Sequence, residues 1–306
     1  MKKMRLTLAC LLILCLLSLS GAVAESPITI QPSRLPVMQL HQINMGCADA
    51  YLVTDGTTVL LVDCGLDTDT PSDTNEPLLT YLAASGIDHV DAHFVTHYHN
   101  DHALNIDLLS SLYGTEDTIV YGPSEELPKR FLPLPNGHYE QLKDWQELDI
   151  GAFHIRCVSP ARPKDRGETN YDSLNFYVTY GQRSIFFTGD WVDYQLFDRH
   201  PECAKPVDIL SFPHHGLKPF CIQEYELRAM NPEIVLVPSR NAFEVKGFLK
   251  YSYCDRFEVY DVTMGNIVIL TDGVDMEIHT DVAPGTYASF GSVTMGDVTH
   301  INLSGV

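Results

Sequence analysis

Four side chains of metal-binding type lie within six positions in the segment "HYHNDH" (97–102). His97 and His99 are one residue apart, so both imidazoles can project to one side and reach the same ion. Asp101 and His102 follow directly, where a turn can bring them to a second ion a few ångströms away. Imidazole nitrogen and carboxylate oxygen suit zinc first, with manganese or iron as less favoured alternatives. The spacing therefore predicts a site for one or two metal ions that can activate water for hydrolysis.

Two later loops carry matching side chains. Asp190 closes "SIFFTGD", where the preceding glycine permits a tight turn and the carboxylate can bridge two ions. His214 and His215 close "DILSFPHHG", and each offers a further imidazole. A lone histidine, or a Gly-Asp pair after a strand, is usually structural. Three such loops, each following an apolar strand, are a specific indication of one shared site.

The loops need strands that deliver them to a common edge. Strand patterns occur in 50–65, 92–96, 118–121, 153–160, 174–181, 184–191, 207–216 and 266–280, and helical patterns in 76–85, 103–112 and the first part of 224–239. Residues 123–140 contain four prolines and favour either a segment that contacts substrate or a plain surface connection. Strand clusters with helices in both halves predict an α/β fold in which two sheets pack together with helices outside.

The N-terminal segment is typical of a secretory signal peptide. Residues 1–24 combine Lys2, Lys3 and Arg5 with an apolar stretch and a small-residue cleavage site at "AVA". A membrane anchor is the alternative, but the apolar stretch is shorter than the roughly 20 residues that span a bilayer. We therefore expect a secreted or extracytoplasmic protein with no membrane span after cleavage, a flexible lead-in at 25–36, and one domain at 37–306.

The composition restricts the class of partner. The formal charge of −20 becomes −23 on cleavage, because the segment carries three of the 20 basic residues and none of the 40 acidic ones. Such a field repels phosphate backbones, so we expect a small-molecule or short nucleotide substrate and not long nucleic acid. Six of the eight cysteines remain after cleavage, and both buried thiols and one or two disulfides are compatible with their scattered spacing.

These motifs together resemble the metallo-β-lactamase superfamily. "HYHNDH" is similar to its HxHxDH motif, "INMGCADAYLVTDGTTVLLVDCG" to its opening strands, and "FFTGD" to its bridging-aspartate motif. The order "NYDSLNFYVTYGQRSIFFTGD" and then "PHHG" resembles most the hydrolase domain of DNA-uptake competence proteins. The resemblance implies an αββα sandwich of two mixed β-sheets with helices on the outer faces. It also implies a set of metal ligands: His97, His99, Asp101, His102, Asp190 and His214, with His215 as the alternative to His214.

One part of the pattern is absent. Where that branch usually has a Gly-His-Pro loop, this chain has "PSRNAFEVKGF" (238–248). One zinc ion is therefore an alternative to two.

The chemistry implied is that of an exported metal-dependent hydrolase. A zinc-bound hydroxide would attack an ester-type substrate, with phosphodiesters or nucleotides ahead of β-lactams or other acyl substrates. Asp101 is the candidate to orient the water or take its proton, and His215 or Lys218 to stabilise negative charge in the transition state. Asp63 is the candidate to hold a ligand imidazole. A binding protein on a degenerate hydrolase scaffold is the alternative of another class, and metal content separates the two.

Overall fold

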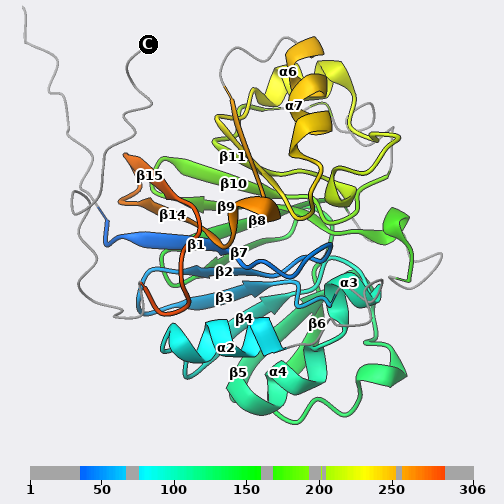
Figure 1. Ribbon diagram of the computed structural model, residues 1–306. Coiled ribbons are helices and arrows are strands. Elements are labelled where there is room, and N and C mark those ends of the chain that lie inside the picture. Colours follow the sequence, from blue (N-terminus) through cyan, green and yellow to red (C-terminus); the bar gives the residue numbers. More distant parts are fainter. Residues whose placement is uncertain are drawn as a thin grey trace, which may run out of the picture. The chain divides into compact units, whose positions relative to one another are not determined.

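Two β-sheets pack face to face in the computed structural model (Figure 1). It describes residues 35–66, 76–159, 168–192, 201, 205–252 and 257–286. Within these ranges one sheet has eight strands, ordered β15-β14-β1-β2-β3-β4-β5-β6, and the other has seven, ordered β13-β12-β11-β10-β9-β8-β7. The strands of the first sheet are β1 (Met38–Gln42), β2 (Tyr51–Thr54), β3 (Val59–Val62), β4 (Val90–Phe94), β5 (Gly114–Gly122), β6 (His138–Gln141), β14 (Ile267–Thr271) and β15 (Met276–His279). Those of the second are β7 (Glu147–Ile150), β8 (Phe153–Ser159), β9 (Asn175–Tyr180), β10 (Arg183–Phe187), β11 (Ile209–Ser211), β12 (Ile234–Val237) and β13 (Glu258–Asp261).

Both sheets are mixed, and the parallel pairs matter most for the site. β3 and β4 run parallel, with Val62 opposite Phe94. β10 and β11 also run parallel, with Phe186 opposite Leu210. Because parallel strands end at the same edge, the residues that follow each pair are brought side by side.

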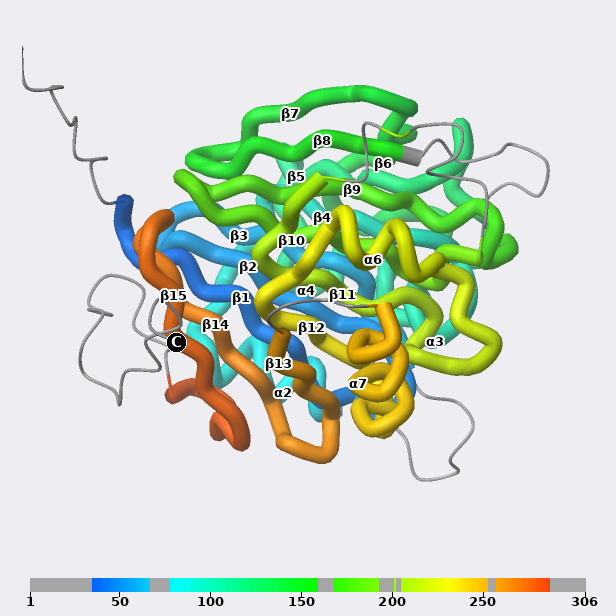
Figure 2. The backbone as a smooth tube through the Cα atoms, turned by 90° about the horizontal axis from the view of Figure 1, so that it is seen from above, coloured from blue at the N-terminus to red at the C-terminus, as the bar shows by residue number. Residues whose placement is uncertain are grey.

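Helices cover the outer face of each sheet. α2 (Glu76–Ala84) and α4 (Ile106–Tyr113) lie against the first sheet, and α6 (Glu224–Met230) and α7 (Ala242–Tyr251) against the second (Figures 1 and 2). Three clusters of buried apolar side chains follow this layering: one between the sheets, one under α2 and α4, and one under α6 and α7. The predicted αββα sandwich of two mixed sheets is confirmed.

The helix predicted over 103–112 is interrupted. α3 (Asn100–Ala103) ends before Leu104, and α4 begins after Asn105. The side-chain amide of Asn105 donates to the carbonyl of Cys64 at 2.9 Å, so this residue anchors the turn to the chain after β3 instead of continuing a helix. The short helix α3 carries Asp101 and His102.

Several predictions fall on the chain outside the described residues. The signal peptide at 1–24 and the lead-in up to residue 34 are among them, as are Cys203 and Cys254. Cys64 is a buried thiol. In the part of the chain that is described, no helix combines the length and apolar character that crossing a bilayer requires.

Candidate metal centre

Four loops meet at one edge of the sandwich. Asp63 follows β3, His97 to His102 follow β4, Asp190 follows β10, and His214 and His215 follow β11. The loops of the first sheet thus face those of the second. Three groups of ligand-type atoms result, each with its atoms within 4.8 Å of one another. The first is His97, His99 and Asp190, the second is Asp101, His102, Asp190 and His215, and the third is Asp49, Asp63 and His102.

The first group gathers on one oxygen of Asp190. Nε2 of His97 lies 3.7 Å from Asp190 Oδ2, and the rings of His97 and His99 are in edge contact with centroids 4.6 Å apart. His214 approaches the same oxygen with its Nε2 at 3.9 Å, and that nitrogen accepts a hydrogen bond from the amide of Asn170 at 3.3 Å. A single ion between these side chains would have imidazole and carboxylate donors.

The second group gathers on the other oxygen of Asp190. Oδ1 lies 3.0 Å from Nε2 of His102 and 3.3 Å from Nε2 of His215. The two imidazole nitrogens are 3.2 Å apart, and Nε2 of His215 is 3.1 Å from Oδ2 of Asp101. Since each Asp190 oxygen faces a different group, this carboxylate would be shared by both groups if each held an ion.

Buried carboxylates orient the rings of the second group. Asp63 Oδ2 lies 2.8 Å from Nδ1 of His102, so the opposite nitrogen of that ring faces Asp190. Asp63 is held in turn by the backbone N–H and hydroxyl of Thr96, at 2.7 and 2.8 Å. Burial raises the pKa of Asp63 to about 6, although the adjacent His102 opposes the shift. This arrangement, in which a carboxylate fixes the tautomer and direction of a ligand imidazole, is common around metal ions.

Asp49 is a site residue that the sequence reasoning missed. It is buried, and its Oδ1 lies 3.1 Å from Nδ1 of His215. Asp49 lies just before β2, and Cys47 is its only near neighbour in the sequence of a metal-binding type. It is brought to the site by a backbone hydrogen bond, which its N–H donates to the carbonyl of Asp101 at 2.9 Å. No local spacing in the sequence could have indicated it.

Two glycines allow the loops to approach this closely. A Cβ atom on Gly65 would lie 1.6 Å from the carbonyl oxygen of Asp101, so no other residue fits there. Gly189 has a φ of +49°, and a Cβ atom there would lie 2.7 Å from Thr96. The glycine before Asp190 is therefore required both for the turn and for contact with the loop that carries His97.

The buried polar atoms fit a metal ion. Among the described residues, Nε2 of His97 is buried and has no hydrogen-bond partner. Burial would raise the pKa of Asp190, but His102 and His215 hold it well below its usual range. Burial would lower the pKa of His215, but Asp190, Asp101 and Asp49 raise it well above its usual value. The carboxylates thus stabilise positive charge at this point, and a divalent cation is the charge that such nitrogen and oxygen donors bind.

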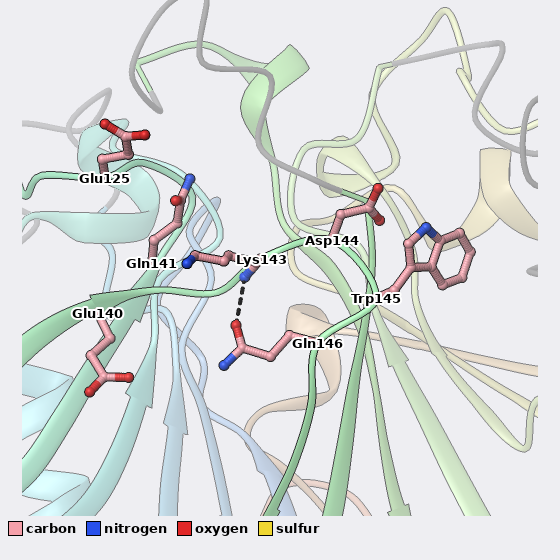
Figure 3. A pocket seen from close by; sticks show the side chains of 7 residues that line it. All are labelled: Glu125, Glu140, Gln141, Lys143, Asp144, Trp145 and Gln146. Carbon is pink, nitrogen blue, oxygen red and sulfur yellow. Dashed lines mark hydrogen bonds between the residues drawn. The ribbon is translucent and has the colours of Figure 1, made fainter.

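The first and second groups open onto one cavity of about 450 Å³. His99, Asp101, His214 and His215 line its floor, and Arg130 and Glu168 are also in its wall. Arg130 comes from the proline-rich stretch 123–140, so that stretch contributes to the cavity as well as forming β6. A separate hollow lies where the chain passes from β6 to β7, and it shares no lining residue with the metal cavity (Figure 3).

The structure brings together every predicted site residue except Lys218. Lys218 lines a different hollow beside α7. His215, predicted to act on the transition state, lies within the second ligand group, and His214 lies farther from Asp190. The catalytic roles of Asp101 and His215 and the ligand role of His214 stay predictions.

Comparisons with known proteins agree with this arrangement. The profile of the Metallo-beta-lactamase superfamily matches residues 47–240, which is more than half of the chain. ComE operon protein 3 of Bacillus subtilis is 23% identical over 175 residues, covering 52% of this chain and only 21% of that protein.

Of two similar solved structures, the first shares the fold and the second is a weaker match. The metallo-beta-lactamase fold protein YhfI of Bacillus subtilis has a TM-score of 0.51 at 17% identity, covering 73% of this chain and 96% of its own. Tm1679, described as a metal-dependent hydrolase of the beta-lactamase superfamily, has a TM-score of 0.49 at 14% identity, covering 73% and 96%. The profile match covers more than half of the chain, and the chain therefore belongs to the metallo-β-lactamase superfamily.

Proposed function

We propose that the protein is an exported zinc hydrolase that cleaves small phosphodiesters or nucleotides. The observation that supports two ions over one is Asp190, whose two oxygens face two separate ligand groups. Zinc held there would supply a Lewis acid and lower the pKa of a coordinated water, which is the chemistry that phosphodiester hydrolysis needs. The signal-type segment at 1–24 supports an extracytoplasmic location.

Asp101 is placed to orient the attacking water. Its side chain is about one-third exposed to the cavity, and His215 holds its Oδ2 at 3.1 Å. Although burial opposes the shift, the hydrogen bond from His215 lowers the pKa of Asp101 to about 2. A carboxylate of so low a pKa is ionised at neutral pH, so it can accept a hydrogen bond from water.

The cavity favours an anionic substrate. Arg130 brings a positively charged guanidinium to its lining, and a cavity of about 450 Å³ suits a ligand the size of a nucleotide. The surrounding field of the acidic chain disfavours a long polyanion but leaves short phosphodiesters acceptable.

Metal content tests the proposal directly. Plasma mass spectrometry on the wild type should find close to two zinc ions, and Asp190→Ala should hold one or fewer. Hydrolysis of bis-p-nitrophenyl phosphate should fall on the order of 100-fold or more in this variant, since even the partners of metal ligands affect activity by 10- to 100-fold. The matched control is Asp117→Ala, because Asp117 is exposed on β5.

Three results would contradict the proposal. Fast turnover of a chromogenic cephalosporin without turnover of the diester would assign the site to acyl chemistry. One zinc ion in both proteins would mean a mononuclear site without Asp190. No zinc in either would indicate a binding protein on a degenerate scaffold.

A further inference from the structure

Arg130 stands on the wall of the metal cavity, on the short 3-10 helix η1 (Lys129–Phe131). Its two terminal nitrogens donate to the two carboxylate oxygens of Glu168, each at 2.7 Å. Nη2 also donates to the backbone carbonyl of Tyr98 at 2.6 Å. Tyr98 lies between the ligand residues His97 and His99, so the guanidinium is tied to the loop that binds the metal.

The platform under Arg130 is rigid. Its guanidinium lies 4.6 Å from the ring centroid of Phe131, which is buried and contacts Tyr98. The hydroxyl of Tyr98 is 2.6 Å from that of Tyr139 on β6 and 3.1 Å from that of Ser124. These contacts hold the guanidinium at a fixed place beside the metal ligands, with little conformational freedom left to lose when a ligand binds.

The charge arrangement resembles a ligand site more than a structural ion pair. Arg130 and Glu168 are 45% and 40% exposed, and ion pairs of that exposure contribute little to stability. Within the described residues, the three bonds use both Nη2 hydrogens and one Nη1 hydrogen, so the Nε and remaining Nη1 hydrogens stay available. The carboxylate of Glu168 shows which shape fits the fork of the guanidinium, namely an oxyanion with two oxygens.

We propose that Arg130 binds a second, terminal oxyanion of the substrate, a phosphate or a carboxylate, beside the bond that is cleaved. Glu168 is an internal anion that competes for the same guanidinium and restricts entry to ligands carrying that extra charge. This proposal rests on the proposed function, because it treats the bound ligand as a substrate. The predicted binding can nevertheless be measured without turnover. Its consequence is that the two members of one ion pair affect ligand affinity in opposite directions.

Equilibrium binding to the zinc-loaded protein tests this directly. The probes are thymidine 5′-monophosphate as reference, thymidine 3′,5′-bisphosphate for a terminal phosphate, and 3′-O-carboxymethyl thymidine 5′-monophosphate for a terminal carboxylate. The wild type should bind at least one of the last two more tightly than the reference, and which one it prefers identifies the anion. Arg130→Gln should weaken that probe by about tenfold or more while changing the reference little, since it removes charged hydrogen bonds. Glu168→Gln should tighten the same probe.

Two variants serve as controls. Arg130→Lys keeps the charge without the fork, so its affinity should lie between those of the wild type and Arg130→Gln. Arg156→Gln removes another arginine with a glutamate partner, Glu147, on the second sheet, and should leave all three affinities unchanged.

Three results would overturn the proposal. The first is equal binding of all three probes by the wild type. The second is a shift in affinity of the same sign in Arg130→Gln and Glu168→Gln, and the third is an equal loss of affinity for every probe, because a structural ion pair behaves in these two ways.

Hydrolysis of the p-nitrophenyl ester of thymidine 5′-phosphate, measured alongside, separates this proposal from the function above. The predicted binding pattern without turnover would support the anion site and contradict the hydrolase of phosphodiesters. Turnover together with equal binding of all three probes would support the hydrolase of phosphodiesters and contradict the anion site.

Discussion

At the scale of single residues, the site depends on carboxylates that never face the substrate. Asp63 is fully buried and fixes His102 through Nδ1 at 2.8 Å. We expect Asp63→Asn to weaken zinc binding by about 10- to 100-fold, because the amide no longer favours the ring orientation and basicity that metal binding needs. Competition titration against a zinc chelator measures this, with the exposed Asp88→Asn as control. An unchanged affinity would mean that His102 is held by its neighbours alone.

At the scale of elements, a buried histidine couples strand β1 to helix α2 and makes stability depend on pH. His41 Nε2 donates to Gln39 Oε1 at 2.9 Å, so its Nδ1 accepts from the Tyr81 hydroxyl at 2.7 Å and the ring is neutral. Burial lowers the pKa of His41 to about 3. The pKa of His41 is lower in the folded than in the unfolded protein. The contribution of the neutral ring to the free energy of unfolding is therefore complete above about pH 6.5. It is lost as the pH falls toward 3, by about 1.4 kcal/mol per pH unit. The free energy of unfolding is measured in urea at pH 5 and 7, on protein from which metal has been removed with a chelator. It should change less with pH in His41→Gln than in the wild type, and His138→Gln, at an exposed position, should leave the change as it is. Equal slopes in all three proteins would contradict the assignment.

At the scale of the whole described unit, the metal centre joins the two sheets. Asp101 and His102 come from the first sheet, whereas Asp190 and His215 come from the second. An ion bound only by the folded form stabilises it by about 4 kcal/mol when its concentration is about 1,000 times its Kd. Chelation should therefore lower the melting temperature by about 8 °C or more. Calorimetry with and without chelator measures the shift, and Asp190→Ala should show a smaller one. A melting temperature insensitive to chelator in the wild type would mean that zinc is not bound tightly across the sheets.

Most strands could be read from the sequence because their apolar residues are consecutive or alternate within a few positions. Strands β1, β6, β7 and β13 were not predicted. The edge strands β6 and β7 are half-exposed and have no apolar stretch. β1 and β13 are too rich in polar residues to stand out, although β1 is buried throughout. Helix α7 was missed for a similar reason: Phe243 and Tyr251 are exposed, so its apolar spacing is irregular. Weak periodicity in these segments is overridden by tertiary pairing, which the local sequence does not record.

The strand and helix patterns of the sequence determined two packed sheets with outer helices, which the family resemblance refined to an αββα sandwich. The metal-type loop at 97–102 and the candidacy of Asp190 followed from spacing over a few residues after an apolar strand. Only the tertiary structure decided that His215 lies closer than His214 to the second ligand group, that Asp49 stands behind it, and that Arg130 and Glu168 share the cavity wall. Those relations join residues that are far apart in the chain. They are set by the packing of one sheet on the other and by the left-handed backbone at His214 and His215, which no local pattern specifies.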